Sequence, residues 1–191
     1  METKIIIKKE RDIGSSIIRL ICVGTLCERK NQMGILQALA SLPNDLQKRY
    51  SLTLVGDGNV RNELENFCSK NMHTEVKFVG SVIDVTPYLL NADIFILLSK
   101  DEGLPISILE AMRCSLPIIS TQVAGIPEMI EDEKSGYLIS PDYQRLSVLL
   151  VDLLENNVDL IKMGERAKKL FEQKFTKEKM ILAYSNLFHS I

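Results

Sequence analysis

The sequence has few of the residues that hold metals or build disulfide frameworks. Only two histidines, His73 and His189, and four cysteines occur among 191 residues, and no C-x-x-C pair is present. Because zinc sites are built from clustered cysteine and histidine side chains, we expect no metal site. The cysteines lie inside or beside apolar runs. This placement is typical of reduced core thiols and predicts a cytoplasmic protein.

Long apolar runs and an excess of one charge are also absent. No segment reaches the roughly 18 apolar residues of a membrane helix, and the N-terminus has no apolar signal region. Lysine and arginine number 23 against 25 aspartate and glutamate residues, for a formal net charge of −2. This balance does not favour polyanions. We expect no nucleic-acid partner and at most peripheral contact with a membrane, at its inner face.

Short apolar runs alternate with helical patterns along the chain, which is 46% hydrophobic and long enough to bury a core. Apolar strands without alternation, each followed by a helix, indicate a parallel sheet covered on both faces. We therefore predict a single α/β domain with a doubly wound, Rossmann-like parallel sheet. The expected strands are Ile17–Gly24, Tyr50–Gly56, Glu75–Gly80, Asp93–Ser99, Leu116–Thr121 and Gly136–Ser140; the expected helices include Asn31–Ser41, Asn59–Lys70, Pro105–Arg113 and most of the chain from Asp142 onward.

The first sixteen residues differ from the remainder. They are rich in charge and end in a Gly-Ser-Ser linker. Residues 1–16 are therefore expected to be an edge strand or a frayed leader, and residues 17–191 the ligand-binding domain.

Ligands of such a sheet bind in the loops at the carboxyl ends of its strands. The loop after the first expected strand, "VGTLCERKNQMG" (Val23–Gly34), places Arg29 and Lys30 at the start of a helix. The helix dipole disfavours cations there, and a bound anion would compensate. The alternative is a pair of solvated basic side chains, which this stretch taken alone favours.

A second candidate loop is "KDEGLPISILE" (Lys100–Glu110), which follows a buried apolar run. Pro105 suits the first position of a helix, and Glu102 is then level with the first helical amides. Carboxylates accept hydrogen bonds from paired hydroxyls, and helix-start amides donate to phosphate, so a nucleotide sugar fits both. The spacing equally allows an acid that stabilises a helix start, with Glu110 solvated.

Two further loops read as turns. "VGDGNVRNEL" (Val55–Leu64) contains G-x-G, but Arg61 occupies the third glycine of the dinucleotide fingerprint. No P-loop motif occurs. In "TQVAGIPEMI" (Thr121–Ile130), Pro127 and Glu128 fit simple turn chemistry.

The run "EGLPISILEAM", followed by G-x-P-E, resembles the E-x7-E signature of retaining GT-B glycosyltransferases of family 4, also called glycosyl transferases group 1. The similarity extends from about Ile18 to Phe188 and is to the C-terminal, donor-binding half of that fold. Its segments occur in the family's order: "VGTLCERKN", "LTLVGDG", "VKFVGSV", "ADIFILLSKDEGLPISILEAM", "LPIISTQVAGIPEMI" and "SGYLISP".

The resemblance implies a role for each matching residue. Glu102 would face the donor-sugar hydroxyls and Lys30 would neutralise the leaving diphosphate, which makes these two the catalytic candidates. Glu110 would accept from the ribose hydroxyls. The remaining donor-binding candidates are Thr25, Arg29, Val79, Gly80, Ser81, Gly103, Leu104, Pro105, Ile106 and Ser107.

The implied reaction is transfer of a sugar from a nucleotide sugar, UDP-linked by default and GDP-linked as the alternative, to a glycan or lipid-linked acceptor. No D-x-D motif occurs, so no metal cofactor is expected. Thr25 stands where the family usually has arginine; either Arg29 substitutes for it or diphosphate binding is weaker.

The acceptor-binding N-terminal half of the family is missing from this sequence. The chain could therefore be an excised domain, a split-enzyme subunit or a nucleotide-sugar-binding module that is inactive alone; a sugar-phosphate synthase is a further alternative. The apolar segment Met180–Phe188 favours contact with a partner domain or chain.

Overall fold

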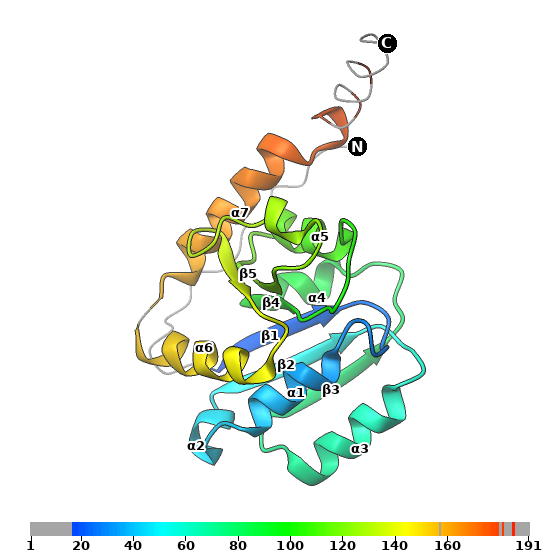
Figure 1. Cartoon of the computed structure of the whole chain (residues 1–191), viewed down its shortest axis with the longest axis vertical. Helices are drawn as coiled ribbons and strands as arrows, with labels where there is room; N and C mark the ends of the chain where they lie inside the picture. Colours follow the sequence, from blue (N-terminus) through cyan, green and yellow to red (C-terminus); the bar gives the residue numbers. More distant parts are fainter. Residues whose placement is uncertain (1–16, 157, 180, 182–184, 186–191) are drawn as a thin grey trace.

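A computed structural model of the chain describes residues 17–156, 158–179, 181 and 185 (Figure 1). The predictions for residues 1–16 and for most of Met180–Phe188 fall outside the described residues. Within them, no helix combines the length and the apolarity that crossing a bilayer requires.

Six parallel strands form one sheet in the order β3-β2-β1-β4-β5-β6. This is the strand order of a Rossmann-type sheet and confirms the predicted fold class. The strands are β1 (Ile18–Val23), β2 (Tyr50–Val55), β3 (Glu75–Gly80), β4 (Ile94–Leu97), β5 (Ile118–Thr121) and β6 (Gly136–Ile139).

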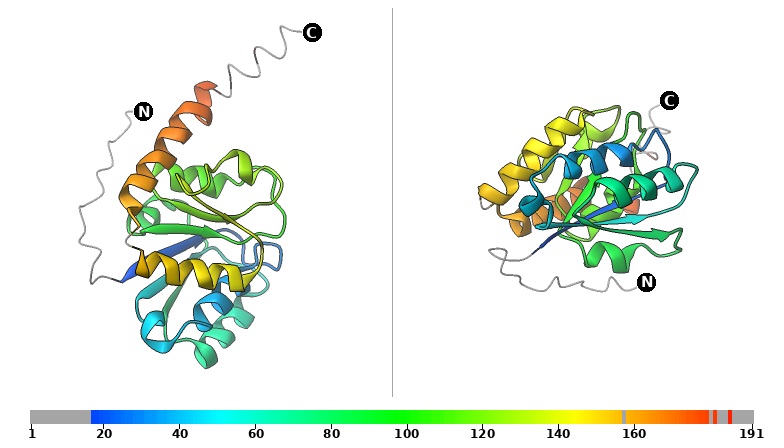
Figure 2. Two further views of the ribbon diagram at one scale, coloured as in Figure 1. Left: turned by 60° about the vertical axis from the view of Figure 1, so that its left-hand side comes forward. Right: turned by 90° about the horizontal axis from the view of Figure 1, so that it is seen from below.

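Helices cover the sheet in two layers (Figure 2). Helix α1 packs against α3 and α6 on one face, and α5 packs against α4 and α7 on the other. The helices are α1 (Gln32–Ala40), α2 (Asn44–Gln47), α3 (Arg61–Asn71), α4 (Thr86–Leu90), α5 (Ile106–Arg113), the 3-10 helix η1 (Ile126–Glu128), α6 (Tyr143–Glu155) and α7 (Leu160–Lys174).

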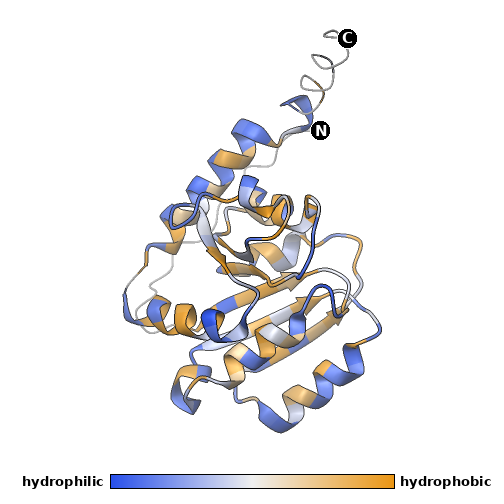
Figure 3. Cartoon of the chain, viewed as in Figure 1, coloured by the Kyte–Doolittle hydropathy of each residue, from blue (hydrophilic) through white to orange (hydrophobic). Residues whose placement is uncertain are grey.

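The central strands explain why the apolar runs identified the fold. Every residue of β4 and β5 is buried, so neither strand alternates. Figure 3 shows the apolar residues concentrated in the sheet and on the inner sides of the helices. Helix α6 is tied to the sheet by the Tyr50 hydroxyl, which donates to the Leu150 carbonyl at 2.5 Å.

The expectation that the strands are apolar without alternation is wrong for β2 and β3. In β2 the polar residues Ser51 and Thr53 are only partly buried, and β3 has no fully buried residue. β3 is an edge strand, and the short helix α4 leaves the Ser51 face of β2 partly open. On the Ser51 face a shallow pocket of about 290 Å³ remains beside Tyr88 of the short helix α4.

The cysteines are all free, as the sequence predicted. Cys22 and Cys114 are buried core residues, whereas Cys27 and Cys68 are only partly buried.

Candidate functional site

The loops after β1 and β4 join at the carboxyl edge of the sheet. The Lys100 amide donates to the Arg29 carbonyl at 2.8 Å, and the Arg29 side chain donates to the Asp101 carbonyl at 2.8 Å. Two segments that are more than 70 residues apart in the sequence therefore form one side of the site. The Lys30 side chain lies beside Gly24: its Cε would be 3.5 Å from a Cβ added to that glycine.

Glu102 is the centre of the site. Its side chain is only 7% exposed, and its Oε1 lies 2.5 Å from Nζ of Lys30, whose side chain is 12% exposed. Ser99 donates to the same oxygen at 2.7 Å. Arg29, which is 51% exposed, lies 3.2 Å from Oε2. The structure thus gathers two cations around one buried carboxylate.

The surroundings keep Glu102 ionised. Burial raises the pKa of its carboxyl, but the hydrogen bonds from Lys30 and Ser99 and the charges of Lys30 and Arg29 outweigh burial, so that the pKa lies below its ordinary value. At neutral pH the side chain is an anion with only acceptor capacity. With Lys30 and Arg29 the cluster carries a net charge of +1.

The structure corrects the interpretation of the basic pair. Helix α1 begins at Gln32, with Asn31 as its N-cap, so Arg29 and Lys30 precede the helix. Lys30 is not a solvated side chain, because it is almost buried against Glu102. The anion beside the two cations is a carboxylate of the protein itself.

The start of α5 also differs from the expectation by one residue. Pro105 is the N-cap, in extended conformation, and the helix begins at Ile106 without a side-chain cap. Glu102 points to Lys30 and Arg29, so it does not cap this helix. Pro105 is buried, Ser107 is partly buried, and Gly103, Leu104 and Ile106 are exposed. This leaves an uncapped helix start beside the cationic cluster.

Glu110 lies one turn further along α5 and is partly buried. Burial raises the pKa of its carboxyl, Asp84 adds to the rise and Arg113 opposes it. Asp84 follows β3 and accepts a hydrogen bond from the Thr86 amide at 2.9 Å. The structure therefore brings Glu110 close to the loop after β3, and it is not the fully solvated residue of the alternative interpretation.

The end of β3 packs against the loop after β2. Val79 and Gly80 are partly buried and Ser81 is exposed. Gly80 has a φ of +85°, and its carbonyl accepts from the Gly56 amide at 2.9 Å. The predicted tight turn into a helix is confirmed, because α3 begins at Arg61 shortly after the end of β2. The Arg61 side chain pairs with Asp57 and Glu65 and lies 5.9 Å from the centre of the Phe78 ring.

Of the remaining predicted residues, Thr25 is exposed in the loop after β1, and its carbonyl accepts from the Gln32 side chain at 2.9 Å. Gly125, in the loop after β5, packs against the Gly103 carbonyl. The sequence did not indicate Ser99 as a site residue; its only signal was its position at the end of an apolar run. Among the described residues, no group of three or more metal-ligating side chains is present.

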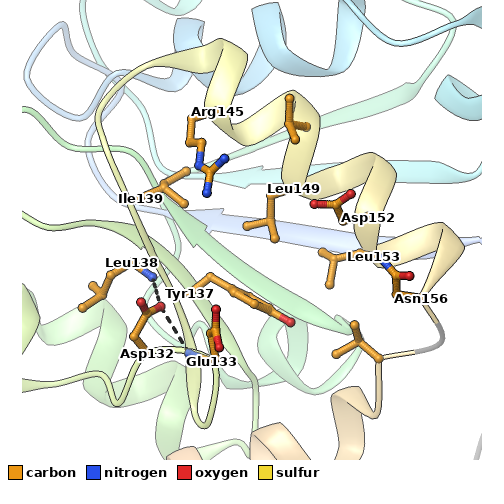
Figure 4. A pocket seen from close by; sticks show the side chains of 12 residues that line it. Asp132, Glu133, Tyr137, Leu138, Ile139, Arg145, Leu149, Asp152, Leu153 and Asn156 are labelled. Atoms are coloured by element: carbon orange, nitrogen blue, oxygen red, sulfur yellow. Dashed lines mark hydrogen bonds between the residues drawn. The ribbon is translucent and has the colours of Figure 1, made fainter.

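A separate pocket of about 430 Å³ lies between β6 and α6 (Figure 4). Tyr137 lies among Asp132, Glu133 and Asp152 there, and Arg145 lines the same pocket. Burial raises the pKa of Tyr137, and the three carboxylates raise it further. The pocket shares no residue with the predicted donor site.

Gly56 allows the loops after β1 and β2 to approach each other. It has a φ of +135°, and a Cβ there would overlap the Gly24 carbonyl oxygen. We expect Gly56→Ala to lower the free energy of unfolding by about 2–4 kcal/mol, through backbone strain and overpacking. Gly103→Ala is the matched control, because a Cβ at Gly103 meets no atom within 4 Å. Denaturant unfolding measures both; equal stability of the two variants would contradict this account.

Comparison with known proteins places this geometry in a family. Residues 4–170 match the family of glycosyl transferases group 1. The N-acetyl-alpha-D-glucosaminyl L-malate synthase of Bacillus anthracis is 32% identical over 193 residues, covering 97% of this chain and 49% of the relative. The amylovoran biosynthesis glycosyltransferase AmsK of Erwinia amylovora is 29% identical, covering 94% of this chain and 46% of the relative.

Solved structures agree with the fold. The Anabaena protein HepE in complex with UDP superposes with a TM-score of 0.82 at 22% identity, covering 93% of this chain and 50% of that protein. The same protein has been solved with UDP-glucose. The chain thus spans about half the length of the relatives it matches. It belongs to the family of glycosyl transferases group 1, and its fold is that of the C-terminal half of a GT-B glycosyltransferase.

Proposed function

We propose that the chain is the donor-binding domain of a retaining glycosyltransferase. The observation that carries the proposal is the cluster at the carboxyl edge, where Lys30 and Arg29 converge on the buried, ionised Glu102. Glu102 accepts hydrogen bonds from hydroxyls of the donor sugar. Lys30 keeps its contact with Glu102 Oε1 and offers its remaining ammonium donors to the diphosphate, which lies at the uncapped start of α5.

The proposed reaction breaks the bond between the anomeric carbon and the diphosphate oxygen. Negative charge develops on the departing phosphate as this bond lengthens. Lys30 and the helix-start amides of Ile106 and Ser107 stabilise that charge in a partly dehydrated site. The acceptor hydroxyl forms the new bond with retention of the anomeric configuration and passes its proton to the departing diphosphate oxygen.

The nucleotide extends toward the loop after β3. Glu110 accepts from the ribose hydroxyls, and the backbone at Val79–Ser81 contacts the base. We take UDP as the nucleotide, because a protein of the same fold has been solved with UDP and UDP-glucose. The relative that acts in amylovoran biosynthesis supports a glycan or lipid-linked acceptor.

A thermal-shift panel of UDP- and GDP-sugars tests donor binding. A ligand present at about 100 times its Kd should stabilise the chain by about 2.7 kcal/mol. We expect at least one nucleotide sugar to raise the Tm more than its free diphosphate does. A chain whose Tm responds to no nucleotide or nucleotide sugar would refute the proposal.

Binding is expected to need no divalent metal, because Lys30 and Arg29 supply positive charge at the proposed diphosphate site. The Kd for UDP should change by less than about twofold when EDTA replaces added Mg²⁺, since the cationic side chains remain. Isothermal titration with and without EDTA measures this. A UDP affinity that disappears in EDTA and returns with Mg²⁺ would exclude the metal-free site.

A further inference from the structure

The two carboxylate oxygens of Glu102 have different surroundings. Oε1 lies 2.5 Å from Lys30 Nζ and 2.7 Å from Ser99 Oγ. A carboxylate oxygen has two lone pairs, so these two donors saturate Oε1. Oε2 faces Arg29 alone, at the longer distance of 3.2 Å. Only Oε2 therefore keeps acceptor capacity for a further donor.

Ser99 is held in place by the neighbouring strand. Its side chain is completely buried, and its carbonyl accepts from the Thr121 hydroxyl at 2.6 Å. This contact lies two residues beyond Leu97, the last residue of β4 that pairs with β5. The hydrogen bond from the Thr121 hydroxyl thus extends the pairing of β4 and β5 to Ser99, the residue whose hydroxyl donates to Glu102.

Arg29 is the more easily displaced of the two cations. Its side chain is 51% exposed, whereas that of Lys30 is 12% exposed. Arg29 also donates a hydrogen bond to the Asp101 carbonyl, so the guanidinium keeps a partner when it leaves the ion pair with Oε2. A sugar hydroxyl can therefore replace Arg29 at Oε2 without leaving a buried charge unpaired.

We infer that Ser99 is a positioning residue, which fixes the Glu102 carboxylate so that Oε2 faces the donor sugar. Arg29 pairs with that oxygen until a sugar hydroxyl displaces it. The inference rests on the proposed donor-binding function and deepens it. The terminal torsion of a glutamate is broad, so the backbone alone does not choose which oxygen faces the ligand. The buried hydroxyl of Ser99 makes that choice.

Ser99→Ala tests the inference, with Ser120→Ala as the matched control. Ser120 is also completely buried, and its hydroxyl donates to the Leu97 carbonyl at 2.8 Å, so its loss likewise removes one buried hydrogen bond. We expect the Kd for the UDP-sugar that binds best to the wild type to rise about tenfold in Ser99→Ala, because one hydrogen bond to a charged group is lost. Binding of UDP without sugar should stay within about twofold in both variants, since the diphosphate contacts remain.

A readout without ligand separates this inference from the proposed function. Carboxyl ¹³C NMR titration should show a higher pKa for Glu102 in Ser99→Ala and an unchanged one in Ser120→Ala. Equal losses of affinity for UDP and the UDP-sugar in Ser99→Ala, which would leave the ratio of the two affinities at its wild-type value, would overturn the positioning role. If wild-type protein bound no nucleotide sugar more tightly than its diphosphate while the pKa of Glu102 still rose in Ser99→Ala, the proposed function would fail and the contact between Ser99 and Glu102 would stand. An unchanged pKa of Glu102 in Ser99→Ala would overturn the positioning role itself.

Discussion

Replacing Lys30 with alanine is expected to weaken UDP binding about 100-fold while changing uridine binding less than about twofold, because a charge-assisted hydrogen bond to phosphate is lost. The Lys30 side chain is mostly buried and lies beside Gly24 at the carboxyl edge of the sheet. A nucleoside lacks the phosphates that this cation serves. Isothermal titration with uridine and UDP measures the two affinities.

A matched control separates the local effect from a general change of charge. Lys100→Ala removes the same charge from the loop after β4, where the Lys100 side chain is exposed. Screening should limit its effect on UDP binding to about threefold. Equal losses of uridine and UDP affinity in Lys30→Ala would remove Lys30 from the diphosphate site.

Loss of stability is the main complication of Lys30→Ala. Removing one partner of a buried ion pair costs about 3–5 kcal/mol, although Arg29 and Ser99 still contact Glu102 here. The double variant Lys30→Met with Glu102→Gln removes both charges of the pair and should recover most of this stability. It should nevertheless bind UDP as weakly as Lys30→Ala does.

The fold could be predicted because its central strands can be recognised from consecutive residues of the sequence. β4 is buried on both faces and appears as a continuous apolar run, whereas β5 begins with two isoleucines and ends in the buried polar residues Ser120 and Thr121. The topological rule that strands meet ligands at their carboxyl ends then placed Lys30 and Glu102 at one edge. Both inferences need only neighbouring residues and the general rules of parallel sheets.

The details that failed depend on contacts between distant segments. The partial exposure of Ser51 and Thr53 follows from the shortness of α4, which leaves a pocket over that face of β2 and which their own apolar neighbours do not reveal. The pairing of Lys30 with Glu102 joins residues from separate loops, so spacing could not show that the cations face a carboxylate of the protein. Ser99 was predicted as the last residue of a strand. Its role depends on the loop after β4 bringing the Glu102 carboxylate within reach of its hydroxyl.

The second large expected effect concerns transfer itself. The chain spans about half the length of its relatives, and the site residues come from one sheet edge. The residues at that edge include exposed apolar side chains: Ile83 is fully exposed, Leu104 is 50% exposed and Ile106 is 71% exposed. Exposed apolar side chains at the edge that carries the site are suited to pack against a covering domain. We therefore expect a second domain to cover this edge and to supply the acceptor site.

A polypeptide of these 191 residues is accordingly expected to bind a nucleotide sugar but to transfer no sugar. Fusion to the N-terminal half of the Erwinia amylovora relative AmsK should bring turnover above background, because the acceptor and the anomeric carbon are then held together. Release of UDP in the presence of glycan and lipid-linked acceptors measures the reaction, and a fusion carrying Lys30→Ala is the control. Sugar transfer by the purified, monomeric 191-residue polypeptide would show that one sheet edge suffices, and that the exposed apolar residues serve another purpose.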